Sequence, residues 1–65
     1  MKVTDEMLLT ERDLARYLDL SPRTLQLWRL QGRGPKAIYL SGHKGVRYPG
    51  SEIRKWIAEQ TGGSA

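Results

Sequence analysis

The stretch TERDLARYLDLSPRTLQLWRLQG, residues 10–32, predicts two short helices joined by a turn too short to fold them back on each other. Thr10 is a good N-cap residue, and Asp13 three positions later completes a capping box. Ser21, followed by proline, marks the start of the second helix, since serine caps a helix and proline suits its first turn. Gly32 marks the end of that helix. This pattern is typical of a helix-turn-helix.

Apolar side chains follow helical spacing in both halves of this stretch. The leucine before the cap, Leu9, is placed to pack on Leu14 as a hydrophobic staple. Small Ala15 suits a contact between crossing helices. We expect the inward-facing set to be Leu9, Leu14, Ala15, Leu18, Leu25 and Trp28.

The residues after Gly32 predict a β-hairpin. Residues 36–40 and 46–48 are rich in β-branched, aromatic and aliphatic side chains, and the loop at 41–45 contains two glycines. A two-stranded ribbon beside a helix-turn-helix predicts the wing of a winged helix. Its basic tip would face a partner of negative charge.

A third helix is predicted after Pro49, with Gly50 or Ser51 as its cap. Its buried stripe is expected to be Ile53, Trp56 and Ile57. The expected fold is therefore mainly α: a winged helix-turn-helix with three helices and a two-stranded wing. We expect residues 1–65 to form one domain, ordered over about 8–60, with a flexible tail at 61–65.

Positive charge is concentrated where the second helix begins. Residues 21–55 hold eight basic side chains and one acidic, a net of +7, whereas residues 1–20 hold three basic and five acidic, a net of −2. An uneven soluble surface would also give such a bias. Together with the helix-turn-helix pattern, however, it favours a nucleic acid as the partner.

The composition argues against several other classes. The chain has no cysteine, which excludes a zinc finger, and His43 is its only histidine, so we expect no metal site and no cofactor. A chain of 65 residues cannot readily enclose a catalytic pocket, so we expect neither an enzyme nor a small-molecule ligand. The acidic start, MKVTDEMLL, resembles neither a signal peptide nor a membrane span.

Two runs, LLTERDLARYLDLSPRTLQLWRLQGRGPKAIYL and VRYPGSEIRKWI, resemble the small MerR-like winged-helix proteins of the excisionase and AlpA group. The resemblance covers about residues 8–58. It implies a cytoplasmic, nucleoid-associated protein of a phage or mobile element that binds double-stranded DNA. Leu27 and Leu30 depart from the group, which tends to carry polar or basic residues there, and the loop at 41–45 is slightly longer than usual.

The second helix, Ser21 to Gln31, is expected to enter the major groove. Arg23 is the leading candidate for a base contact, since arginine can bind guanine with two hydrogen bonds, and a phosphate contact is its alternative. Leu27 would meet a thymine methyl or a protein neighbour, whereas Leu30 is expected to pack under the wing or the third helix. The candidate set on this helix is Ser21, Arg23, Thr24, Gln26 and Leu27.

The loop and the wing supply the remaining candidates, whose expected role is to neutralise phosphates or enter the minor groove. Arg29 is expected to pair with a nearby acidic residue instead. Among the aromatic residues, Trp28 and Trp56 are expected in the core, so only Tyr39 or Tyr48 would serve a single-strand binder. The loop and wing set is Arg33, Lys36, His43, Lys44 and Arg47.

The predicted function is sequence-specific binding of double-stranded DNA by an excisionase-like factor that directs recombination. Such a factor would bind cooperatively, bend DNA, associate with itself on DNA and act beside an integrase or other recombinase. An AlpA-like transcriptional regulator is the close alternative. An alternative of another class is an interaction module that docks a recombinase or a polymerase subunit.

Overall fold

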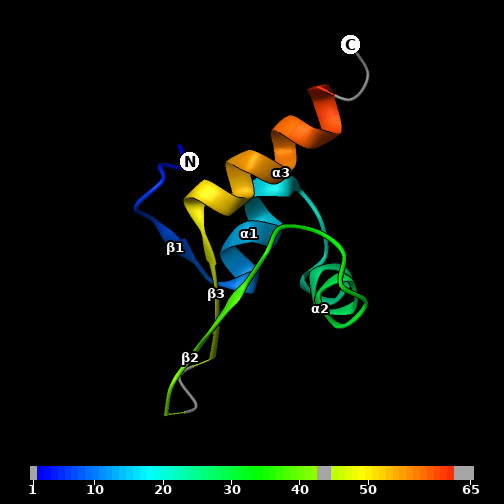
Figure 1. The fold of residues 1–65 in the computed structure, drawn as a ribbon. Helices are drawn as coiled ribbons and strands as arrows, with labels where there is room; N and C mark the ends of the chain where they lie inside the picture. The colour runs from blue at the N-terminus through cyan, green and yellow to red at the C-terminus, as the bar shows by residue number, and fades with distance from the viewer. Residues whose placement is uncertain (1, 43–44, 63–65) are drawn as a thin grey trace.

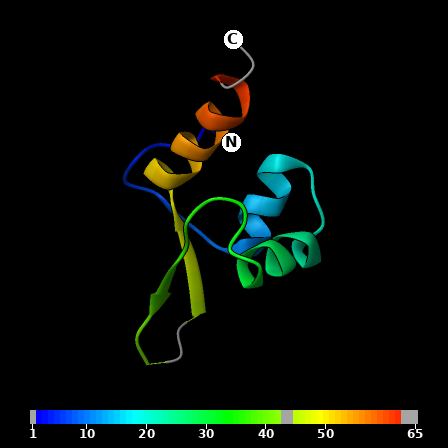
Figure 2. The ribbon, with the colours of Figure 1, turned by 45° about the vertical axis from the view of Figure 1, so that its right-hand side comes forward.

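Across residues 2–42 and 45–62, which the computed structural model describes, three helices pack beside a small antiparallel sheet. The order is β1 (Leu8–Leu9), α1 (Glu11–Leu18), α2 (Pro22–Leu30), β2 (Ile38–Leu40), β3 (Gly45–Pro49) and α3 (Gly50–Gly62). Helices α1 and α2 lie side by side, α3 crosses above them, and the β2–β3 hairpin projects away from α3 (Figures 1 and 2). The predicted winged helix-turn-helix class is confirmed.

The caps predicted from the sequence define α1 and α2. The Thr10 hydroxyl accepts a hydrogen bond from the Asp13 backbone N–H at 3.0 Å, and the Ser21 hydroxyl accepts one from that of Arg23 at 3.2 Å. Between the helices, Asp19 has a left-handed backbone with φ of 58°, which aspartate tolerates better than most residues. The turn between the two helices is therefore encoded locally.

The sheet contains a strand that the sequence analysis missed. Strand β3 lies in the centre, paired on one side with β2 and on the other with β1, where Leu9 lies opposite Tyr48. Two leucines are too few to show strand alternation, and the position of Leu9 before the Thr10 cap indicates a hydrophobic staple instead. Strand β1 ties the chain before α1 to the wing.

The core lies where α1 and α2 meet β3 and the start of α3. Its largest fully buried side chains are Tyr48, Leu9, Leu14, Leu25 and Ile53. Tyr48 is therefore not available for base stacking.

Trp28 and Trp56, both expected in the core, are half-buried: Trp28 packs against the buried core from its edge, whereas Trp56 packs on Trp28. Their ring centroids lie 5.7 Å apart with the planes tilted by 46°, so the two rings pack on each other where α2 meets α3. Helical spacing placed them on the inward side of each helix, but it could not show that α3 lies at the edge of this core.

Helix α3 follows β3 without a linker. It begins at Gly50, so both predicted cap candidates lie inside it. The Gly50 N–H donates to the Met7 carbonyl at 2.7 Å, and a Cβ at Gly50 would lie 1.7 Å from the Thr4 carbonyl oxygen. The chain before β1 therefore packs directly on the start of α3. Within the described part of the chain, no helix has both the length and the apolar character needed to cross a membrane.

Candidate nucleic-acid interface

The outer face of α2 is exposed to solvent. Leu25 on the inner face is buried, whereas Arg23 and Gln26 are exposed and Leu27 keeps 44% of its surface accessible. Leu30 is 69% exposed, so the prediction that it packs under the wing or the third helix is wrong. At roughly 100° per residue, position 30 lies about 140° around the helix from Leu25 and therefore faces outward.

The start of α2 brings several predicted residues together. Ser21 is exposed and caps the helix with its side chain, Arg23 lies in the first turn, and Thr24 is half-buried. The N-terminal end of a helix carries partial positive charge and favours anions. This end of α2 therefore combines the positive end of the helix dipole with an exposed arginine.

The loop and wing candidates are more dispersed. Arg33 is exposed and its guanidinium Cζ lies 5.9 Å from the Trp28 ring centroid, while Lys36 is exposed in the loop before β2. Arg47 lies on the central strand, half-buried, and donates to the Val46 carbonyl at 2.9 Å. His43 and Lys44 lie outside the described residues.

A hydrogen-bonded group holds α2 against α1 and the sheet. Arg29 binds Glu11 through Nε at 2.6 Å and through Nη2 at 3.4 Å, which confirms the predicted pairing with an acidic residue. The Tyr48 hydroxyl donates to the same carboxylate at 2.7 Å. A third arginine nitrogen, Nη1, donates to the Tyr39 hydroxyl at 3.3 Å. These four residues, which we call the Arg29 group, join α1, α2, β2 and β3.

The Arg29 group perturbs its own protonation equilibria. Burial alone would raise the pKa of Glu11, but the hydrogen bonds from Arg29 and Tyr48 and the charge of Arg29 outweigh it, so this pKa is lowered. The pKa of Tyr48 is raised, first by burial and then by its hydrogen bond to Glu11. The hydrogen bond to Glu11 is also the main cause that raises the pKa of Arg29. At neutral pH the group therefore holds an ion pair and a neutral tyrosine.

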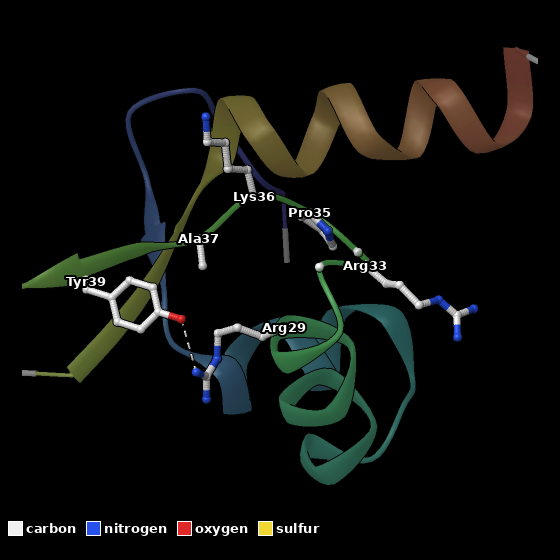
Figure 3. A pocket seen from close by; sticks show the side chains of 8 residues that line it. Arg29, Arg33, Pro35, Lys36, Ala37 and Tyr39 are labelled. Atoms are coloured by element: carbon white, nitrogen blue, oxygen red, sulfur yellow. Dashed lines mark hydrogen bonds between the residues drawn. The ribbon is translucent and has the colours of Figure 1, made fainter.

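A cleft opens between the end of α2, the following loop and β2 (Figure 3). Its volume is about 280 Å³. The Tyr39 ring points across it toward Arg29, while Arg33 and Lys36 extend outward from its rim (Figure 3). Its lining consists of Arg29, Gly32, Arg33, Gly34, Pro35, Lys36, Ala37 and Tyr39.

Sequence reasoning missed Tyr39 as a member of this surface. Tyr39 is 67% exposed and lies at the middle of β2, opposite Val46. The available signal was its place in a short predicted strand that follows two basic residues, Arg33 and Lys36. Nothing in the sequence showed that the hydroxyl would meet Arg29.

The charge on this surface follows from which cations are paired. The described residues form ion pairs between Arg29 and Glu11 and between Arg54 and Asp5, the latter at 2.8 Å. Arg23, Arg33 and Lys36 are exposed and take part in neither pair. Unneutralised cations therefore lie at the start of α2 and beside the cleft.

An outward-facing second helix, an adjacent hairpin and unpaired cations define a small DNA-binding domain of the winged helix-turn-helix class. Residues 8–61 match the family model described as "Helix-turn-helix domain", and the chain belongs to this family of small, AlpA- and excisionase-like DNA-binding domains. Members of the family are typically not enzymes. No curated protein and no solved structure matches the chain.

Proposed function

We propose that this chain binds double-stranded DNA in a sequence-specific manner, with α2 in the major groove and the β2–β3 hairpin at the adjacent backbone or minor groove. The observation that carries the proposal is the outer face of α2, where Arg23 and Leu27 are exposed while Leu25 fixes the opposite face in the core. A rigidly held helix with a polar and apolar outer face can read base edges. On this proposal Ser21, Thr24 and Gln26 add contacts at the groove, and the basic wing residues bind phosphates.

The role we propose is that of an excisionase-like factor of a phage or mobile element, acting on DNA beside an integrase. One reading helix contacts only a few base pairs, so useful specificity needs several copies on adjacent sites. Copies that follow the groove would bend the DNA, at a cost of about 1–6 kcal/mol for a site of 20–30 base pairs. Contacts between neighbouring copies would offset that cost.

The test begins with selection of a preferred site from random duplex DNA. Footprint titration on one and on two tandem copies of that site then measures cooperativity, and a circular-permutation assay measures bending. We expect cooperative filling of tandem sites and bent DNA. Independent filling of straight DNA would contradict the excisionase-like role and leave an AlpA-like transcriptional regulator.

One observation favours a different class of function. Leu20, Leu27 and Leu30 are all exposed, as expected of a module that docks a recombinase or polymerase subunit. The two functions differ in their response to salt. A DNA-binding domain loses affinity for duplex steeply as salt rises, because bound phosphates release counterions. A chain that leaves duplex DNA unshifted even at low salt would be an interaction module.

A further inference from the structure

We propose that the cleft between α2 and β2 binds one backbone phosphate of the duplex, with the Tyr39 hydroxyl as the hydrogen-bond donor. The inference rests on the proposed function and adds to it a contact site and a residue. It concerns the phosphate backbone alone, so it makes no claim about base sequence.

The first argument is the direction of the hydrogen bond between Arg29 and Tyr39. A guanidinium can only donate, so at 3.3 Å from Arg29 Nη1 the Tyr39 oxygen must be the acceptor. A phenol can donate as well as accept. Among residues 2–42 and 45–62, no side chain or carbonyl accepts the Tyr39 hydrogen. That hydrogen is therefore available to an incoming acceptor.

The second argument is that Arg29, which contacts the Tyr39 hydroxyl, is itself held in place. Glu11 holds Arg29 by two hydrogen bonds, at 2.6 and 3.4 Å, and Tyr48 holds Glu11 at 2.7 Å. The carboxylate binds Nε and Nη2, so Nη1 is directed toward Tyr39. An anion at the Tyr39 hydroxyl would thus meet the positive end of the ion pair first. A donor fixed beside a positive charge binds an anion more strongly than a free hydroxyl does.

The third argument is accessibility. Tyr39 is 67% exposed although Arg29 contacts its hydroxyl, so a ligand can reach it from solvent. Arg33 and Lys36 extend from the rim of the same cleft (Figure 3). They would attract the polyanion to this surface and bind the neighbouring phosphates. The cleft lies between the reading helix and the wing, and a DNA strand contacted by both must cross that space.

The test is Tyr39→Phe, which keeps the ring and removes the hydroxyl. We expect roughly ten-fold weaker binding to the selected site and to random duplex alike, as for loss of one hydrogen bond to a charged group. The salt dependence of binding should stay unchanged, because a neutral donor releases no counterion. Tyr17→Phe is the matched control, since it makes the same change at a tyrosine exposed on α1, and it should bind as the parent does.

Duplexes that carry a neutral methylphosphonate at one position identify the phosphate. At one position the substitution should weaken the parent but leave Tyr39→Phe unaffected, because both changes remove the same contact. Unchanged binding by Tyr39→Phe, a loss confined to the selected site, or additive losses at every position would overturn the inference. A parent that binds no duplex at all would instead overturn the proposed function and this site with it.

Discussion

Arg23 and Leu27 lie one turn apart on the outer face of α2, and they offer different chemistry to a base pair. Arginine donates in a fork that matches the two acceptors of guanine, whereas leucine can contact only the methyl group of thymine. The outer face of α2 therefore predicts that the preferred DNA sequence contains both guanine and thymine.

The first prediction separates base reading from charge. Arg23→Ala should weaken binding to the selected site by about 1–3 kcal/mol and binding to random duplex much less, because a base contact is lost. Arg33→Ala is the matched control. It should weaken both to a similar degree and lower the salt slope by about one unit. Equal losses on both duplexes for Arg23→Ala would make Arg23 a phosphate contact.

The second prediction concerns Leu27 and uses DNA that lacks single methyl groups. Replacing one thymine of the selected site by deoxyuridine should weaken the parent by about 0.8 kcal/mol, near a four-fold loss, because one methyl leaves an apolar contact. The Leu27→Ala variant should bind both duplexes equally. If instead Leu27→Ala binds single sites normally and loses only tandem cooperativity, Leu27 contacts a neighbouring protein.

At the scale of elements, the Glu11 carboxylate joins α1 to α2 and β3, and Arg29 extends the Arg29 group to β2. The third prediction follows from the lowered pKa of Glu11. A carboxyl whose pKa is lower in the folded state stabilises the fold above its unfolded pKa, and this contribution disappears as pH falls through the folded pKa. Glu11→Gln should therefore cost about 1–2 kcal/mol at pH 7 and progressively less below about pH 4.5.

Urea unfolding of the parent and Glu11→Gln across pH 2–7 measures this difference. Asp5→Asn is the control, because the Asp5–Arg54 pair leaves 60% of each side chain exposed and such pairs contribute less than about 1 kcal/mol. A difference between parent and Glu11→Gln that stays constant with pH would contradict the assignment.

The fourth prediction concerns the junction of β3 and α3. Alanine normally favours a helix over glycine by about 1 kcal/mol, but Gly50→Ala should destabilise the protein. Its Cβ would lie 1.7 Å from the Thr4 carbonyl oxygen, and the backbone must move to relieve that overlap. We expect a loss of about 1–3 kcal/mol in urea unfolding. Ser51→Ala, at the next and exposed position, should change little, and a stabilised Gly50→Ala would disprove the close contact.

The elements differ in how well the sequence predicts them, for physical reasons. The starts of helices α1 and α2 are determined by nearby residues, since the side chains of Thr10 and Ser21 cap them. Strand β1 is formed by partners about forty residues away, and two leucines carry no periodic signal. The sequence predicts a helix after Pro49, but no local pattern reveals the close packing of Gly50 on Thr4.

The residues of the candidate interface likewise differ in how well the sequence predicts their positions. Spacing on a helix correctly placed Arg23 and Leu27 on one outer face and directed Arg29 toward an acidic partner. The prediction for Leu30 failed because it assumed that the wing or the third helix covers this residue, and helical spacing does not show where neighbouring elements lie. The Tyr39 contact joins β2 to α2 through side chains whose meeting depends on the whole fold.

At the scale of the whole molecule, the chain before β1 completes the core. Val3 is buried with 7% of its surface accessible, although the resemblance to the family begins only at residue 8. The fifth prediction is that deletion of residues 2–7 lowers the free energy of unfolding by at least about 1.5–3 kcal/mol, the contribution expected from burial of Val3 alone, because the deletion also removes the Met7 carbonyl that accepts the Gly50 N–H. Thermal melting measures it, and Lys2→Ala, at an exposed position, is the control. An unchanged melting temperature after the deletion would show that this segment adds nothing to the core.

The central position of β3 also determines when, during synthesis, α2 becomes usable. A ribosome releases α1 and α2 first, but Tyr48 and Ile53, which complete the core around Leu14 and Leu25, are added later. Until then the inner faces of both helices stay exposed to water, and such surfaces attract chaperones or aggregate. A nascent chain that stalls before Tyr48 would therefore carry the complete reading helix and still be unable to hold it toward DNA.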